Sequence, residues 1–265
     1  MEAGTAVSQN ERDIITVENA TVGYGDKVTL QDLSLTVAEG EILTILGPSG
    51  CGKTTLLKAI IGLISVMRGR ITLVGEEIAP VGDDEALSRV RRRIGVLFQS
   101  GALLNSMSIE DNVALPLKQF TKLPKDLIRH MVRLKLGLVK LADYGRLMPH
   151  ELSGGMSKRA GLARAMSLDP KVLFCDEPTA GLDPPNAREI DGLLLELNRY
   201  LGITIVMITH ALPTIENIST RCIMLDAAAK GIIASGTPDE LKNRSSDERV
   251  RSFFHREIND RPTGK

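Results

Sequence analysis

Short apolar runs alternate along the chain with segments whose apolar residues repeat at helical spacing. The runs are six to eight residues long and contain few polar residues, as expected of strands that are buried on both faces. The predicted strands are 41–47, 94–99, 171–177, 203–210 and 221–226. Predicted helices follow the first run and lie near 186–200 and 211–219. This alternation predicts a mostly parallel sheet with helices on both faces.

Two parts of the chain depart from this alternation. Residues 14–37 contain β-rich segments separated by turn residues, which predicts an antiparallel patch, and 69–78 is predicted to be another strand pair. Between Ser100 and Ser157 the pattern is helical, so this segment is predicted to be a helical lobe inserted into the sheet domain. The expected division is a flexible N-terminus (1–12), one α/β domain (13–238) with a helical subdomain at about 100–158, and a charged C-terminal tail (239–265).

Composition and charge narrow the function classes. The 265 residues include 33 basic and 33 acidic side chains and no tryptophan, so neither a basic surface nor a base-stacking platform is indicated, and no nucleic-acid partner is expected. The sequence has no secretory signal pattern and no apolar run near the ~20 residues of a membrane helix. We therefore expect a soluble cytoplasmic chain that acts on a membrane through another subunit. Cys51, Cys175 and Cys222 lack metal-ligand spacing and are predicted to be buried thiols.

The stretch GPSGCGKT at 47–54 follows an apolar strand and precedes a helix. It matches the pattern G-x-x-x-x-G-K-[ST], in which glycines let backbone N–H groups surround a phosphate at the positive end of the helix. Lys53 is predicted to reach the β and γ phosphates, and the Thr54 hydroxyl to help hold Mg²⁺. The alternative, a chance glycine-rich turn, is disfavoured by the strand and the helix on either side.

Polar residues suited to nucleotide chemistry end three further apolar runs: Gln99, Asp176 with Glu177, and His210. Ligands of open parallel sheets bind beyond the carboxyl ends of the strands, so these residues are expected at one site. We expect Asp176 to bind Mg²⁺ and Glu177 to polarise the attacking water. Gln99 can contact both metal and water, and His210 can bond to the γ-phosphate. For Gln99 and His210 an ordinary strand-terminal cap or turn is the alternative.

The segment Ser153–Gly155 before a predicted helix is either a serine-capped helix start or a set of bare N–H groups aimed at an anion. The motifs GPSGCGKTT, Gln99, LSGGM, VLFCDEPTAGLD and His210 stand in this order, and together they resemble the ATP-binding subunit of an ATP-binding cassette (ABC) transporter. The resemblance covers roughly residues 14–238. It implies the α/β P-loop NTPase fold of the ABC ATPases, ATP and Mg²⁺ as cofactors, and ATP hydrolysis coupled to transport.

The resemblance also implies how the site is assembled. In the family, two cassettes dimerise head to tail, and the serine-glycine-glycine segment of one closes over the γ-phosphate held by the other. One phosphate loop per chain therefore implies a homodimer, although pairing with a different ATPase is an alternative. Asp183 matches the residue that couples the two sites, and Tyr24 matches the aromatic that stacks on adenine, with a core or turn tyrosine as the alternative. The implied nucleotide-contacting residues are Tyr24, Gly47, Pro48, Ser49, Gly50, Cys51, Gly52, Lys53, Thr54, Thr55, Ser153, Gly154, Gly155 and Asp183. The implied metal ligands are Thr54, Gln99 and Asp176, and the implied catalytic residues are Glu177, His210 and Gln99.

The variants LSGGMSKRAGLARA and FQSGALLNSMSIEDNVALPL are similar to the Mla/Mce-associated (MlaF-type) subset of these ATPases. That subset serves phospholipid transport between the membranes of Gram-negative bacteria. The implied partners are an integral membrane permease of the MlaE type, a STAS-domain accessory protein of the MlaB type and a periplasmic Mce-domain protein. The implied location is the cytoplasmic face of the inner membrane. Met156 and Ala211 depart from the commonest family pattern, in which glutamine and aspartate stand there, but neither removes a phosphate ligand.

Several alternatives remain open in the sequence. Leu103, Leu104 and Met107 either receive a permease helix or belong to the core of the helical lobe. Phe253 and Phe254 either pack on a partner or belong to a local C-terminal helix. Three alternative functions remain: the ATPase of another ABC transporter, a soluble ABC ATPase that acts on nucleic acid or ribosomes, and a scaffold that binds ATP without hydrolysing it. Zero net charge argues against the nucleic-acid alternative, and the presence of Glu177 and His210 argues against the scaffold.

Overall fold

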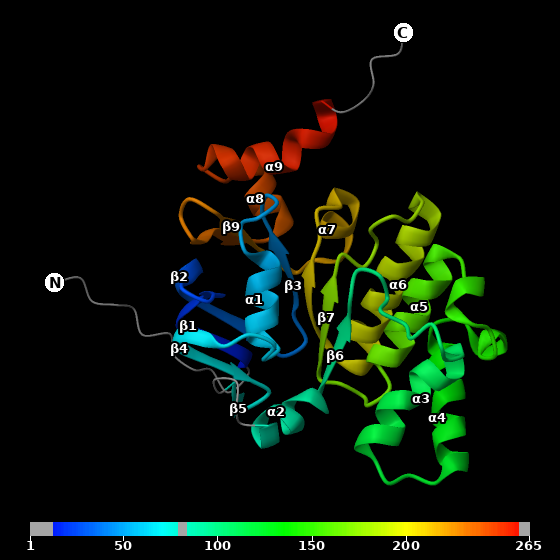
Figure 1. The fold of residues 1–265 in the computed structure, drawn as a ribbon. Helices are drawn as coiled ribbons and strands as arrows, with labels where there is room; N and C mark the ends of the chain where they lie inside the picture. Colours follow the sequence, from blue (N-terminus) through cyan, green and yellow to red (C-terminus); the bar gives the residue numbers. More distant parts are fainter. Residues whose placement is uncertain (1–12, 79–83, 260–265) are drawn as a thin grey trace.

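The computed structural model describes residues 13–78 and 84–259 (Figure 1). The predicted flexible N-terminus, 1–12, and the last residues of the predicted tail, 260–265, lie outside this part of the chain. Among the described residues, no helix is both long enough and apolar enough to cross a bilayer.

The centre of the molecule is a sheet with the strand order β10-β9-β3-β8-β7-β6. Its strands are β3 (Ile42–Leu46), β6 (Ile94–Leu97), β7 (Val172–Asp176), β8 (Thr204–Ile208), β9 (Arg221–Asp226) and β10 (Gly231–Gly236). The strands from β9 to β6 are parallel, and β10 pairs antiparallel with β9. β3 and β8 are buried at every position, which explains why they appear in the sequence as continuous apolar runs. The predicted parallel α/β core is confirmed.

A smaller antiparallel sheet has the order β2-β1-β4-β5. Its strands are β1 (Asp13–Tyr24), β2 (Lys27–Ala38), β4 (Val66–Leu73) and β5 (Glu76–Glu77). Helix α1 (Lys53–Ile60) packs in one hydrophobic core with this sheet and the large one, through residues such as Leu56, Ile15 and Ile45. The antiparallel patch predicted for 14–37 is confirmed, and the strand pair predicted at 69–78 joins the same sheet.

Helices occupy the chain between β6 and β7 (Figure 1). They are α3 (Ile109–Phe120), α4 (Lys125–Leu138) and α5 (Gly154–Ala165), with short 3₁₀ turns at Ala142–Tyr144 and Pro149–Glu151. Together with α6 (Pro184–Leu201) they form a second hydrophobic core. Alternate residues of β7 face the two cores, since Phe174 lies in the first and Leu173 in the second. α1 and α5 therefore cover opposite faces of the large sheet.

The C-terminal segment folds back onto the molecule (Figure 1). The remaining helices of the described chain are α2 (Asp84–Arg91), α7 (Leu212–Ile218), α8 (Pro238–Asn243) and α9 (Glu248–Asn259). Phe253 and Phe254 of α9 are buried in a third core with Leu46 of β3 and Met224 of β9. Their rings meet edge to face at 5.5 Å. Of the two alternatives for this aromatic pair, the structure shows the local C-terminal helix.

Candidate nucleotide site

The phosphate loop, residues 47–52, joins the end of β3 to the start of α1. Gly47 has a φ of 140°, and a Cβ atom there would lie 2.5 Å from the Leu225 carbonyl oxygen, so a side chain does not fit. The N-cap residue of α1 is Gly52, which provides no side-chain hydrogen bond to the helix start. The first N–H groups of α1 therefore have no side-chain cap and can bind an anion.

Lys53 lies over this loop. Its Nζ donates hydrogen bonds to the carbonyl oxygens of Gly47, at 2.7 Å, and Pro48, at 2.9 Å. A neutral carbonyl oxygen is a weaker acceptor for an ammonium group than a charged phosphate oxygen. A nucleotide phosphate in the loop would therefore offer the same ammonium group a stronger partner.

The other predicted loop residues share this turn. Ser49 and Gly50 are exposed, and Thr54 is exposed on the first turn of α1, while Thr55 is buried. Cys51 is buried with its sulfur 3.9 Å from the Lys53 Nζ, and burial raises the pKa of its thiol. Thr54 is thus placed to contact a ligand, whereas Thr55 and the Cys51 thiol point into the protein.

The polar strand ends lie along one edge of the large sheet. β3, β8, β7 and β6 are consecutive parallel neighbours, and Asp176 is in register with Ile208. The phosphate loop, His210, the acidic pair and Gln99 therefore follow one another across the carboxyl edge. Gln99 and His210 are exposed there, and Asp176 and Glu177 are half-buried. This edge is the ligand-binding edge of an open parallel sheet.

Glu177 and His210 contact each other directly, a pairing that the sequence did not predict. The Oε1 of Glu177 lies 2.7 Å from the Nδ1 of His210. The Glu177 backbone has a φ of 49°, an uncommon value for a residue with a side chain, and its N–H donates to the Ile208 carbonyl. The buried Lys158 of α5 donates from Nζ to the Glu177 carbonyl oxygen at 2.9 Å. The two backbone bonds hold Glu177 in this uncommon conformation, and the contact with His210 fixes its carboxylate.

Asp176 has the chemistry of a divalent-cation ligand. Burial, followed by the neighbouring Glu177 carboxylate, raises the pKa of its carboxyl group, and Lys58, Lys158 and Lys53 oppose this only in part. A divalent cation would supply the missing positive charge, and Mg²⁺ prefers oxygen ligands. No group of three His, Cys, Asp or Glu side chains with metal-binding spacing occurs within 13–78 and 84–259. The predicted ligands Asp176, Thr54 and Gln99 all carry side-chain oxygens, which is the ligand type that Mg²⁺ prefers.

The segment Ser153–Gly155 forms the start of α5. The Ser153 hydroxyl accepts a hydrogen bond from the Met156 N–H at 3.3 Å, so the serine does cap the helix. A Cβ on Gly155 would lie 2.8 Å from Oδ1 of Asn186, and this contact alone accounts for that glycine. A Cβ on Gly154 would meet only Leu182, at 3.4 Å. Nothing within the described chain requires a glycine at 154, and its backbone is exposed at the start of α5.

The remaining predicted contact residues flank these elements. Tyr24 is 51% exposed at the end of β1, which excludes the core alternative for its ring. Asp183 is the N-cap residue of α6, exposed, and its Oδ1 accepts a hydrogen bond from Asn186. Asn186 therefore lies between Gly155 and Asp183 and links the start of α5 to the loop that follows Glu177.

The two departures and the apolar segment after Gln99 have local explanations. Met156 packs against the second core, and Ala211 is the N-cap residue of α7, with its N–H bonded to the Thr209 hydroxyl. Leu103 also packs against the second core, whereas Leu104 is 43% exposed. The lobe-core alternative thus holds for Leu103, and Leu104 is free to contact a partner.

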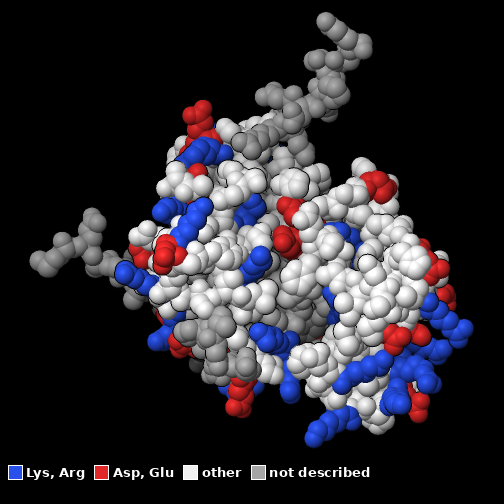
Figure 2. All heavy atoms as spheres, viewed as in Figure 1, with Lys and Arg blue, Asp and Glu red and all other residues white. Residues whose placement is uncertain are grey.

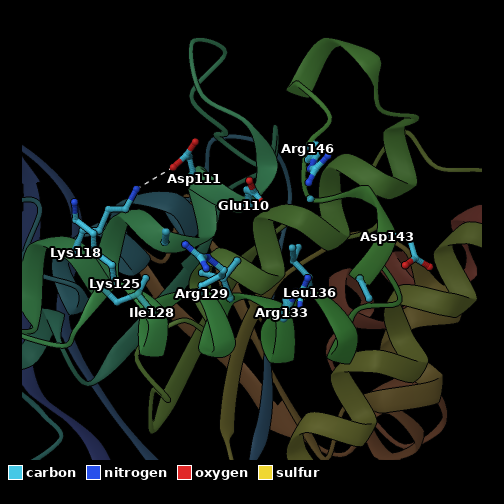
Figure 3. A pocket seen from close by; sticks show the side chains of 14 residues that line it. Glu110, Asp111, Lys118, Lys125, Ile128, Arg129, Arg133, Leu136, Asp143 and Arg146 are labelled. Atoms are coloured by element: carbon cyan, nitrogen blue, oxygen red, sulfur yellow. Dashed lines mark hydrogen bonds and ion pairs between the residues drawn. The ribbon is translucent and has the colours of Figure 1, made fainter.

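Two cavities are lined by none of the residues Gln99, Asp176, Glu177 and His210. One, of about 770 Å³, lies on the helical lobe between α3, α4 and the turn at Gly145 (Figure 3). It has an apolar floor and mixed charges on its rim, and no phosphate-loop residue lines it. The other, of about 300 Å³, lies between Pro48 and α9. Arg249 of α9 forms a 3.0 Å ion pair there with Asp226 at the end of β9. Sequence reasoning missed this contact between the C-terminal helix and the neighbourhood of the phosphate loop, because no motif marks it.

Known proteins with similar sequences and structures agree with this geometry. A family model described as ABC transporter matches residues 30–180. The chain is 42% identical to the intermembrane phospholipid transport system ATP-binding protein MlaF of Haemophilus influenzae, covering 92% of this chain and 90% of that protein. It is 39% identical to a protein of Mycobacterium tuberculosis named "Probable ribonucleotide transport ATP-binding protein mkl", covering 91% of this chain and 66% of that protein.

Among solved structures, a dimeric ATP-binding cassette in a post-hydrolysis state with ADP and phosphate matches with a TM-score of 0.76 and 28% identity. The match covers 84% of this chain and 98% of that chain. The phosphate loop, the acidic strand end and the glycine-rich start of α5 are thus found on the fold that this family uses for ATP hydrolysis. The chain belongs to the ABC transporter family and is one of its ATP-binding, ATP-hydrolysing subunits.

Proposed function

We propose that ATP hydrolysis by this subunit powers a membrane permease that moves phospholipids. The proposal is supported by the name and the 90% coverage of the relative from Haemophilus influenzae. The mycobacterial relative makes a ribonucleotide a second candidate cargo, at lower identity and with 66% of that protein covered. The cargo is selected by the permease, so the nucleotide site of this chain is compatible with either.

Each ATP is held between two copies of the chain. The phosphate loop precedes α1 on one face of the large sheet, and Ser153–Gly155 begins α5 on the opposite face. Exposed backbone at Gly154 is suited to a phosphate that another copy presents. The dimeric state of the solved cassette at 28% identity supports the same arrangement. ATP bound by both copies stabilises the dimer, and hydrolysis removes that bridge.

Within each site, different residues bind the phosphates, hold the metal and activate the water. Lys53 and the N–H groups of the loop neutralise phosphate charge. Thr54, Gln99 and Asp176 would hold Mg²⁺, which supplies positive charge to the phosphate oxygens. Glu177 polarises the attacking water, and its 2.7 Å contact with His210 is the observation on which this catalytic assignment depends. His210 holds the Glu177 carboxylate through Nδ1, and its imidazole is exposed at the carboxyl edge of the large sheet.

The partners are a permease of the MlaE type, a STAS-domain accessory protein of the MlaB type and a periplasmic Mce-domain protein, with this chain on the cytoplasmic face of the inner membrane. Leu104 and Met107 are candidate permease contacts because they follow Gln99 on a partly exposed segment. An accessory protein has a suitable surface on α4, where Leu127, Leu134 and Leu138 are exposed at helical spacing. Basic side chains gather around the same lobe on the face in Figure 2.

Reconstitution of the complex in proteoliposomes tests the cargo. We expect ATP-dependent movement of a fluorescent phospholipid by the complex with the wild-type chain, and none with Glu177→Gln. ATPase activity that is stimulated by ribonucleotide and unaccompanied by lipid movement would contradict the phospholipid assignment and support the second cargo.

The shared site is tested separately. Ser153→Arg places a bulky cation at the start of α5 and should block ATP-driven dimerisation without weakening ATP binding to a single chain. Ser153→Thr keeps a capping hydroxyl and is the matched control. Normal dimer formation by Ser153→Arg in size-exclusion or light-scattering measurements would contradict the proposal that residues 153–155 close over the γ-phosphate bound by the other copy.

A further inference from the structure

Asp191 of α6 is a buried carboxylate without a cationic partner in the described chain. The residue is 5% exposed and lies beside Ile190 and Leu194, which are fully buried in the second core. Its Oδ2 accepts a hydrogen bond from the Thr214 hydroxyl at 3.1 Å, and its Oδ1 has no partner among the described residues. Burial raises the pKa of this carboxyl group. Burying a carboxylate without full hydrogen bonding destabilises the folded state, whereas an apolar residue at this helix position would not. The presence of Asp191 here therefore needs an explanation.

The Thr214 hydroxyl is also 3.4 Å from the hydroxyl of Thr179. The Thr214 hydroxyl donates its hydrogen to Asp191, so the Thr214 oxygen is left to accept from Thr179. Thr179 is 5% exposed and Thr214 is 2% exposed, so water does not compete for these groups. The three side chains form a buried chain of hydrogen bonds with a fixed direction.

These hydrogen bonds join the two segments that provide the catalytic pair, Glu177 and His210. Thr179 stands two residues after Glu177, and Thr214 stands four residues after His210, in the first turn of α7. Asp191 itself is on α6, which begins at the end of the loop that contains Thr179. The segments of Glu177 and His210 are therefore joined by the side-chain contact of the two residues and by the Glu177 N–H bond to Ile208. Asp191, Thr214 and Thr179 add a buried connection beneath them.

We propose that Asp191 is a positioning residue for ATP hydrolysis. It holds Thr214, and through it Thr179, so that the Glu177 carboxylate and the His210 imidazole meet at the distance that hydrolysis requires. Asp191 does not touch the nucleotide, and its effect passes through the two loops. The inference rests on the proposed roles of Glu177 and His210.

The expected signature is a loss of turnover without a loss of ATP binding, because Lys53 and the phosphate loop are on other elements. A displacement of about 1 Å at a catalytic group lowers the rate by up to ~10²-fold. We expect Asp191→Val, which cannot accept a hydrogen bond, to lower kcat roughly 10-fold while KM for ATP stays within about 2-fold. Asp191→Asn keeps an acceptor oxygen and should retain most of the turnover.

The threonine gives a second, isosteric test. Thr214→Val removes the hydroxyl at constant shape and should reproduce the effect of Asp191→Val, whereas Thr214→Ser keeps the hydroxyl and should restore turnover. Asp191 and Thr214 act through the same series of hydrogen bonds. The double variant Asp191→Val with Thr214→Val should therefore lose no more turnover than either single variant. If Asp191→Val does not fold, the Val and Ser variants at Thr214 decide the question alone.

The measurement is steady-state ATPase activity of the full chain in its membrane complex, with ATP affinity and thermal unfolding measured on the same samples. Wild-type kcat in folded Asp191→Val or Thr214→Val would overturn the inference, as would equal losses in Thr214→Val and Thr214→Ser. Glu177→Gln is measured beside them. Full turnover in Glu177→Gln would defeat the proposed function itself, whereas an inactive Glu177→Gln with a fully active Thr214→Val would defeat the positioning role alone.

Discussion

The Oε1 atom of Glu177 lies 2.7 Å from the Nδ1 atom of His210, although the two residues follow different strands of the sheet. β7 and β8 are parallel neighbours, so their carboxyl ends lie side by side. The acidic residue is only 14% exposed, whereas the imidazole is 73% exposed. A shielded carboxylate held by an accessible imidazole is suited to polarising a water molecule at the edge of the site.

Replacing Glu177 by glutamine should separate binding from hydrolysis. The amide keeps the size of the side chain but is a very weak base, so we expect turnover to fall by roughly 10²–10⁴-fold. ATP affinity should stay near that of the wild type because the phosphate loop is unchanged. Steady-state ATPase assays and equilibrium ATP binding measure the two effects, and wild-type turnover would refute the assigned role.

Replacing Lys53 by alanine should have the opposite pattern, with binding as the main loss. A charge-assisted hydrogen bond is worth about 1.5–3 kcal/mol, so ATP affinity should fall roughly 10–100-fold. Lys122→Ala is the control, since it removes an exposed lysine between α3 and α4, outside the phosphate loop. Unchanged ATP affinity in Lys53→Ala by titration calorimetry would count against the phosphate cradle.

The C-terminal helix should contribute to stability through its aromatic pair. Phe254 is 3% exposed in the core that contains Leu46, the residue before the phosphate loop, so Phe254→Ala should destabilise the chain by about 3–5 kcal/mol. Leu134→Ala on α4 is the control, because Leu134 is 69% exposed and its truncation should cost little. Denaturant unfolding measures both. Equal stability of the two variants would mean that α9 does not pack as described.

Cys222 should make stability fall at alkaline pH. Burial raises the pKa of its thiol to about 12, whereas an unfolded thiol ionises near ~8.5. Between these values the unfolded chain loses a proton that the folded chain keeps, so the free energy of unfolding decreases by about 1.4 kcal/mol per pH unit. Cys222→Ala should reduce the slope of stability against pH above ~8.5, measured by denaturant unfolding. An unchanged slope would show that Cys222 does not contribute.

Much of this architecture follows from local sequence pattern. β3, β7 and β8 are buried on both faces, so they had to be apolar runs, and their polar ends had to lie at one edge once they were parallel. The phosphate loop was predictable because its glycines and lysine are needed at fixed spacing. The insertion of a helical lobe was likewise visible as a change of periodicity between Ser100 and Ser157.

Contacts between distant segments were not predictable in this way. Nothing in the sequence around Arg249 indicates Asp226 as its partner, and that contact exists because α9 folds over the end of β9. In the sequence, Asp191 is one polar residue among many on a predicted amphipathic helix. Its hydrogen bond with Thr214 depends on how α6 packs against α7. Such pairings are set by tertiary packing, which a single sequence does not display.

The central claim, that two copies of the chain enclose each nucleotide, is tested most directly by a structure of the Glu177→Gln variant trapped with ATP. The prediction is a dimer in which Gly154 and Gly155 of one copy lie within hydrogen-bond distance of the γ-phosphate bound at Lys53 of the other. A structure in which these two glycines lie far from every γ-phosphate would contradict the account.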